Sequence, residues 1–253
     1  MMKSTISKKI MVANIPVMLD CPEEMNASLR TVLRGEYEFG YFGENLTVLD
    51  MGANVGSFTM WANLRWPKSK IHAYEPDPGT FKILAANVES LSNVTCHNLA
   101  VYPSEKGSEL FWSRYAGDGE AGIDDHVEEE FKGLSEASAR EVAVIHPRSL
   151  PKADVIKLDV EGAESMILRE MALQDVSLIL LEYHTVKNRD FIKELLRDDF
   201  ALEYEDGFRW GAALPGPGHP EYKEEWENEY EGHLFFANRL RNKLKLYRGR
   251  KYC

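Results

Sequence analysis

Cysteine is scarce in this sequence, and long apolar runs are missing. The three cysteines, Cys21, Cys96 and Cys253, are far apart in the 253 residues and form no C-x-x-C pair. We therefore expect neither a disulfide framework nor a zinc site, and we interpret the cysteines as reduced thiols. No stretch approaches 18 consecutive apolar residues, and no export signal follows the polar N-terminus. The sequence thus predicts no membrane span and a cytoplasmic location.

Basic charge is also scarce over most of the chain. The net charge is −11, and the segment 239–253 holds seven basic residues and no acidic one. Removing these seven from the 30 basic residues leaves 23 against 41 acidic ones over residues 1–238, a net charge of −18. A surface of that sign repels phosphate backbones, so nucleic acid is not an expected partner. The basic tail is either a solvated terminus or a contact for an acidic partner or an anionic surface.

From Thr47 onward, segments of strand length alternate with segments of helical periodicity. Strands are predicted over residues 47–51, 70–75, 94–101, 154–160, 177–183 and 233–238. This alternation predicts crossover connections and a doubly wound, mostly parallel sheet of the α/β class.

The domain boundaries follow from the same pattern. Residues 1–45, with a helix predicted over 23–34, form a short N-terminal cap on one domain over residues 46–238, and the basic tail 239–253 follows. Two acidic stretches, 117–130 and 207–232, interrupt the alternation, and we expect them to be loops or insertions on the sheet.

The strongest local motif is V-L-D-M-G-A-N-V-G, which runs from Val48 to Gly56. An apolar strand leads into a turn where Gly52 permits a sharp bend and the close approach of a ligand. The amides at the start of the following helix face a polar or negatively charged group. A dinucleotide fingerprint requires G-x-G-x-x-G, and Asn54 stands where its second glycine would fall. That residue disfavours a nucleotide-dependent oxidoreductase, which is the obvious competing function.

Acidic residues end two further predicted strands. Glu75, in A-Y-E-P-D, ends the second strand, where a carboxylate accepts hydrogen bonds from both ribose hydroxyls of a nucleoside. Asp159, in I-K-L-D-V-E-G-A-E, is expected in the crevice where open α/β sheets bind ligands. The alternative is that Asp159 and Glu161 merely favour the dipole of the helix that begins near Gly162.

The motif L-E-Y-H places Glu182 and His184 on the same face of the next strand, because strand side chains alternate. Histidine titrates near neutral pH, so His184 is a candidate base for an acceptor hydroxyl, with a purely structural role as the alternative. If the fold brings them together, Asp159, Glu182 and His184 are also candidate ligands of a divalent cation.

Taken in order, these motifs resemble the FkbM family of S-adenosylmethionine-dependent methyltransferases over about residues 36–200. The run K-L-D-V-E-G-A-E is the part most specific to that family. The resemblance implies a seven-stranded, Rossmann-like sheet of the class I methyltransferases, with a final antiparallel strand. It also implies S-adenosylmethionine as the cofactor and O-methylation of a hydroxyl on a small molecule such as a sugar or polyketide.

The resemblance also assigns residues to the cofactor: Asp50, Gly52, Asn54, Gly56, Glu75, Asn98 and Ala100. For the in-line attack on the sulfonium methyl, we predict that His184 is the base and that Asp159 orients the acceptor. A module that binds S-adenosylmethionine without catalysis is the main alternative. The stretches 117–130 and 207–232 depart from a minimal family member, so the acceptor is the least transferable inference.

Overall fold

The computed structural model describes residues 5–12, 15–22, 37, 41–116, 118, 120–123, 138–205, 208–209, 230–239 and 245–246. The predicted helix over 23–34 lies outside these ranges, as do most of 117–130, most of 207–232 and most of the basic tail. Among the helices that the structure describes, none has the length and apolar character needed to cross a membrane.

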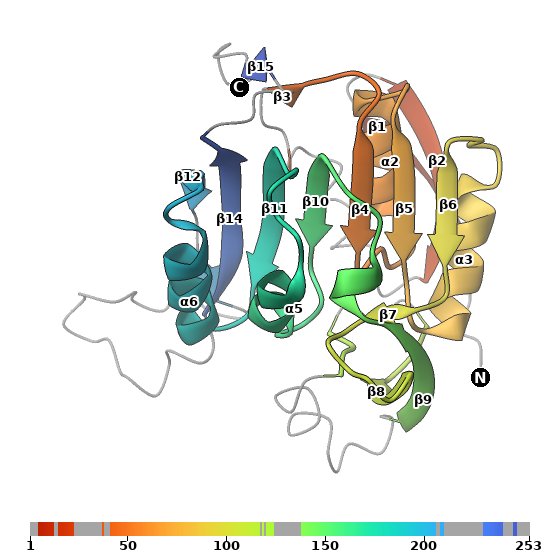
Figure 1. Cartoon of the computed structure of the whole chain (residues 1–253). Helices are drawn as coiled ribbons and strands as arrows, with labels where there is room; N and C mark the ends of the chain where they lie inside the picture. Colours follow the sequence, from red (N-terminus) through yellow and green to blue (C-terminus); the bar gives the residue numbers. More distant parts are fainter. Residues whose placement is uncertain are drawn as a thin grey trace.

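Seven strands form the central sheet, in the order β12–β14–β11–β10–β4–β5–β6 (Figure 1). Their bounds are β4 (Thr47–Met51), β5 (Lys70–Tyr74), β6 (Val94–His97), β10 (Val155–Leu158), β11 (Leu178–Tyr183), β12 (Phe200–Glu205) and β14 (Tyr230–Asn238). Neighbouring strands are parallel except at β14, which runs antiparallel to both β11 and β12. The short β13 (Phe208–Arg209) also pairs with β14. The predicted mostly parallel, doubly wound sheet of seven strands is confirmed.

The side chains of the central sheet divide between two apolar layers. In β4, for example, Val48 packs into one cluster and Leu49 into the other. The first layer lies under α2 (Ser57–Arg65), α3 (Pro78–Val88) and the hairpin of β1 (Thr5–Val12) and β2 (Ile15–Pro22), and the second under α5 (Glu164–Glu170) and α6 (Val186–Leu196) (Figure 1). Because both faces are covered, the central strands are apolar along nearly their whole length.

The N-terminal hairpin is fastened to the helix layer through one side chain of α3. The amide group of Asn87 accepts a hydrogen bond from the backbone of Asp20 at 2.8 Å and donates to the Asp20 carbonyl at 2.9 Å. It also donates to the Val55 carbonyl at 2.8 Å. Farther along, β15 (Lys245–Leu246) pairs antiparallel with β3 (Tyr41–Phe42), so part of the tail lies beside the segment that precedes the domain's first strand.

The predicted strand over 94–101 is interrupted. β6 ends at His97, whereas β7 (Ala100–Val101) joins β9 (Ser138–Ile145) and β8 (Ser108–Ser113) in a separate small sheet. At the interruption, the Asn98 side chain donates to the carbonyl oxygens of Glu75 and Pro76, both at 2.9 Å. The small sheet lies at the carboxyl ends of the central strands (Figure 1). There, Arg140 pairs with Asp77 at 2.7 Å, which ties β9 to the start of α3.

Candidate functional site

The candidate site lies where the strand order reverses. From the central pair β4 and β10, the chain continues to β5 and β6 on one side and to β11 on the other. Open α/β sheets bind ligands at this point, outside the carboxyl ends of the strands. Except for Ala100, which lies in the small sheet, the predicted site residues are at these carboxyl ends.

The turn after β4 is held between its two neighbouring strands. The amides of Gly52 and Ala53 donate to the Tyr74 carbonyl at the end of β5, at 3.2 and 2.9 Å. Gly52 has φ 76°, and a Cβ atom there would lie 1.7 Å from the carbonyl oxygen of Asp159. Asn54 also has a positive φ, 49°, which asparagine tolerates better than most residues. Glycine at position 52 therefore lets the turn pack directly on the end of β10.

Glu75 lies immediately after β5, and its side chain is fixed by the backbone. One carboxylate oxygen accepts from the Asn54 amide at 2.9 Å and the other from the Asp77 amide at 2.8 Å. The residue is 6% exposed, and this burial raises the pKa of its carboxyl to about 8, against the opposing effect of the two amides. The carboxylate retains lone pairs for hydroxyl donors of a ligand.

One more polar atom at the turn fits a bound ligand. The side-chain oxygen of Asn54 is buried and accepts no hydrogen bond from any residue that the structure describes. Buried polar atoms are normally paired, so a ligand N–H or O–H group would satisfy this one. The turn and Glu75 together therefore fit a nucleoside-type cofactor with a polar tail.

Three other residues assigned to the cofactor have internal roles in the structure. Gly56 caps α2 at φ 94°, where a Cβ atom would lie 2.8 Å from Leu84. Asn98 holds the backbone at Glu75, as described above, and Ala100 packs with the apolar side chain of Phe111. Their direct contact with a cofactor stays a prediction.

Lys157 links the two halves of the site, and the sequence reasoning missed it. Its ammonium group donates to the Gly52 carbonyl at 2.7 Å and pairs with Asp159 at 3.1 Å and with Asp50 at 3.6 Å. Burial by itself would lower the pKa of Lys157, but the attraction of the two carboxylates outweighs it and raises this pKa. Lys157 lies directly opposite Asp50 in the register of β10 and β4, a pairing that only the strand order reveals.

Asp50 is enclosed rather than open to a ligand. The residue is fully buried, and besides Lys157 it accepts a hydrogen bond from the Thr59 hydroxyl on α2. Burial raises the pKa of Asp50, and Lys157 acts in the opposite direction. Any effect of Asp50 on a cofactor is therefore transmitted through Lys157 and the backbone of the turn.

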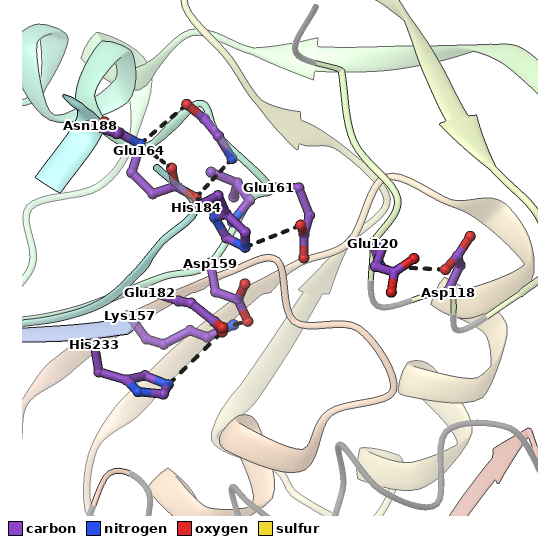
Figure 2. A network of polar contacts seen from close by, with 12 residues as sticks. Asp118, Glu120, Lys157, Asp159, Glu161, Glu164, Glu182, His184, Asn188 and His233 are labelled. Atoms are coloured by element: carbon purple, nitrogen blue, oxygen red, sulfur yellow. Dashed lines mark hydrogen bonds and ion pairs between the residues drawn. The ribbon is translucent and has the colours of Figure 1, made fainter. Parts of the chain in front are cut away.

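Asp159, Glu182 and His184 come together at the ends of β10 and β11 (Figure 2). One potential ligand atom from each lies within 4.8 Å of the other two. His233, the cross-strand partner of Glu182 on β14, faces it with 4.0 Å between imidazole Nε2 and the carboxylate. Sequence reasoning missed His233, because this residue lies about 50 residues farther along the chain and reaches the site only through the antiparallel strand.

The ring of His184 is held between two carboxylates. Nδ1 lies 3.1 Å from Glu164 and Nε2 lies 3.1 Å from Glu161. Burial alone would lower the pKa of His184, but these two carboxylates raise it well above the usual value. An imidazolium with both nitrogens engaged has no lone pair for a proton, so this geometry gives the predicted base role of His184 no support.

The two neighbouring carboxyls have opposite pKa shifts. Burial, followed by the nearby charge of Asp159, raises the pKa of Glu182 well above its usual value. For Asp159, burial acts in the raising direction, but Lys157 and His184 outweigh it and lower the pKa. Asp159 is thus the carboxylate whose charge the surrounding residues stabilise more strongly.

Glu164 is a buried support for His184. It is fully buried in the first turn of α5 and accepts from the amides of Val160 at 3.2 Å and Gly162 at 3.1 Å. Its second oxygen accepts from the side chain of Asn188 at 2.7 Å (Figure 2). These contacts fix the orientation of the imidazole ring.

The strand order and the reversal at β4 and β10 define the fold of the class I S-adenosylmethionine-dependent methyltransferases. The chain belongs to the family described as the methyltransferase FkbM domain, whose sequence profile matches residues 50–209, more than half of the chain. The predicted family is thereby confirmed.

Curated relatives share this domain at low identity. Methyltransferase 1 from Beauveria bassiana is 27% identical over 158 residues, which cover 53% of this chain and 61% of that protein. The hexuronic acid methyltransferase AglP from Haloferax volcanii is 26% identical over 158 residues, which cover 61% of this chain and 63% of that protein. The 31-O-demethyl-FK506 methyltransferase FkbM from Streptomyces tacrolimicus is 48% identical over 40 residues, 16% of this chain and 15% of that protein. The chain thus spans about three fifths of the first two relatives.

Proposed function

We propose that this protein is an S-adenosylmethionine-dependent methyltransferase that methylates a hydroxyl oxygen of a small molecule such as a sugar or polyketide. The observation that carries the proposal is Glu75, a buried carboxylate fixed by two backbone amides at the end of β5. Hydroxyls of a ribose are the donors that such a carboxylate accepts in nucleotide-binding sheets. The family match over residues 50–209 supports the same cofactor.

The site offers separate surfaces to the two substrates. Glu75 and the Asn54 side-chain oxygen bind the nucleoside and the polar tail of the cofactor at the turn after β4. Asp159 and Glu182 bind the acceptor at the ends of β10 and β11. The contact between Gly52 and the Asp159 backbone keeps these two surfaces adjacent. Methyl transfer requires this adjacency, because acceptor oxygen, methyl carbon and sulfur must be in line.

In the proposed reaction, an electron pair of the acceptor oxygen forms the bond to the methyl carbon. The carbon–sulfur bond breaks with its pair left on sulfur, and the hydroxyl proton leaves to solvent. The sulfonium cation thereby becomes the neutral thioether of S-adenosylhomocysteine. Carboxylates such as Asp159 orient the acceptor by accepting a hydrogen bond from its hydroxyl.

The acceptor class is proposed from two sources. The names of two relatives refer to a hexuronic acid and to the 31-O position of FK506, and they support our proposal of a hydroxyl oxygen of a sugar or polyketide as the acceptor. In this chain, the paired carboxylates of Asp159 and Glu182 suit a neutral polyol better than a phosphate, which they would repel.

Calorimetric titration with S-adenosylmethionine and S-adenosylhomocysteine tests the cofactor. We expect saturable binding that Glu75→Ala weakens by at least about tenfold, since the variant removes acceptors for two ribose hydroxyls, each worth roughly 0.5–1.5 kcal/mol. Glu89→Ala, which removes an exposed carboxylate after α3, is the matched control and should bind normally. Transfer of a labelled methyl group to sugar and polyketide alcohols then tests the acceptor. Absence of binding by the folded wild-type protein would refute the proposal.

A further inference from the structure

The cluster of Asp159, Glu182 and His184 has the dimensions of a cation site (Figure 2). Its ligand atoms lie within 4.8 Å of one another. A single ion that binds oxygen and nitrogen at about 2.0–2.3 Å holds its ligands at most about 4.6 Å apart, so small side-chain adjustments suffice. We propose that these three residues bind one divalent cation of the Mn²⁺ type, which holds the acceptor hydroxyl. This inference rests on the proposed methyltransferase function.

An independent observation is the support of the histidine ring. A metal-ligating histidine commonly donates its second ring N–H to a carboxylate, which fixes the ring and directs the other nitrogen at the metal. His184 is 4% exposed and its Nδ1 lies 3.1 Å from Glu164, a fully buried carboxylate with three further donors. Nε2 is therefore the nitrogen that faces the cluster, with Glu161 at 3.1 Å.

The charges of the cluster also favour a cation. Four carboxylates, those of Asp159, Glu161, Glu164 and Glu182, surround one imidazole ring. The His184 ring and Lys157 offer compensating charges, but the ammonium group of Lys157 is shared with Asp50 and the Gly52 carbonyl. A divalent ion complements such a concentration of negative charge. When the ion binds, Nε2 loses its proton to solvent and exchanges its contact with Glu161 for the ion, and the Glu161 carboxylate becomes available as a further oxygen ligand.

The position of the cluster beside the cofactor turn would let the cation activate the acceptor hydroxyl. The backbone of Asp159 packs against Gly52 in the cofactor turn, so a cation held by the Asp159 side chain lies next to the methyl donor. A divalent cation polarises an alcohol and lowers the pKa of its hydroxyl. The cation would activate the acceptor hydroxyl, which His184 does not do because both nitrogens of its ring are engaged. Two carboxylates and one imidazole suit Mn²⁺ most directly, with Zn²⁺ and Mg²⁺ as competitors.

The experiment titrates the EDTA-treated and dialysed wild-type chain with Mn²⁺, followed by electron paramagnetic resonance. We expect one Mn²⁺ per chain, and spin-echo modulation from one directly bound imidazole nitrogen. Glu182→Gln is expected to weaken Mn²⁺ binding by more than roughly tenfold, and His184→Gln to abolish the nitrogen signal. Glu194→Gln makes the same glutamate-to-glutamine change on the exposed surface of α6, and this control variant should bind Mn²⁺ as the wild type does. Circular dichroism establishes that each variant is folded.

The outcomes separate the cation from the cofactor. S-Adenosylmethionine binding is measured in the presence of EDTA on the same preparation. If the cofactor binds but Mn²⁺, Zn²⁺ and Mg²⁺ do not, the cation site is refuted and the methyltransferase proposal stands. Binding of Mn²⁺ without nitrogen coupling, or with the same affinity in Glu182→Gln, also refutes the site. Failure of the cofactor to bind with or without Mn²⁺ refutes the proposed function itself.

Discussion

Replacing Glu75 by glutamine is expected to change how the stability of the ligand-free protein depends on pH. The buried carboxyl of Glu75 has a pKa raised to about 8 from its model-compound value of 4.5. Between these two values the folded protein keeps its proton while the unfolded chain has lost it. Folding therefore takes up a proton, and the stability supplied by this group is complete below pH 4.5 and is lost as the pH rises through about 8.

The magnitude follows from the shift and from the hydrogen bonds. A change from 4.5 to about 8 corresponds to at most about 5 kcal/mol, and we expect about 2–5 kcal/mol after relaxation of the site. Glutamine does not titrate, but its amide nitrogen cannot accept from the backbone amide of Asn54 or Asp77. One lost hydrogen bond with a buried donor costs about 1–3 kcal/mol. The unfolding free energy of Glu75→Gln relative to the wild type should therefore rise between pH 5.5 and 9, and the variant should be at least as stable as the wild type near pH 9.

Urea unfolding of both proteins at pH 5.5, 7, 8 and 9, followed by far-ultraviolet circular dichroism, measures this difference. Glu89→Gln, at an exposed position, serves as the control and should follow the wild type at each pH. If the difference in unfolding free energy between Glu75→Gln and the wild type stays constant within about 0.5 kcal/mol from pH 5.5 to 9, Glu75 has an ordinary pKa and the reasoning fails.

Three further predictions concern the residues around the two halves of the site and the core. Lys157→Met leaves two carboxylates without their cation and should destabilise the fold by about 3–5 kcal/mol in urea unfolding. Lys152→Met, which removes an exposed ion pair, should cost less than about 1 kcal/mol. Equal losses of stability in the two variants would contradict the linking role of Lys157. Gly52→Ala and Gly107→Ala both place alanine at a positive φ, but only the alanine at position 52 meets a backbone oxygen, at 1.7 Å. Thermal unfolding should therefore show a loss of unfolding free energy of about 3 kcal/mol or more for Gly52→Ala and of about 1 kcal/mol for Gly107→Ala. Phe236→Ala in the second apolar layer should cost about 3–5 kcal/mol, while the exposed Phe191→Ala should change stability by less than about 1 kcal/mol, and a similar loss from both would mean that β14 is not part of the core.

The sequence by itself predicted the sheet well, because local signals specify its parallel strands. The run Thr47–Met51 is a strand with the predicted bounds, and 177–183 differs from β11 by one residue. Apolar runs that end in polar residues indicate strands whose carboxyl ends meet at one edge of a parallel sheet, so the sequence alone predicts that Glu75, Asp159 and His184 lie at this edge.

The prediction from the sequence pattern was wrong at Asn98, where hydrogen bonds of a side chain interrupt the predicted strand. Residues 94–101 have strand character throughout, yet the structure divides them between two sheets at Asn98. The reason is that the Asn98 amide donates to two carbonyls near Glu75, more than 20 residues earlier. A long-range hydrogen bond of this kind leaves no trace in local periodicity.

The sequence by itself therefore determined the family, the strands that make up the sheet and the kinds of side chain at the carboxyl ends of these strands. Tertiary structure alone decided the electrostatic state of those side chains. Lys157 became the link between the cofactor turn and Asp159 because β10 pairs with β4, and His233 reached Glu182 because β14 runs antiparallel beside β11. The pKa of His184 is raised because folding buries its ring between the carboxylates of Glu161 and Glu164. A pKa depends on distances and burial, and both are properties of the folded chain.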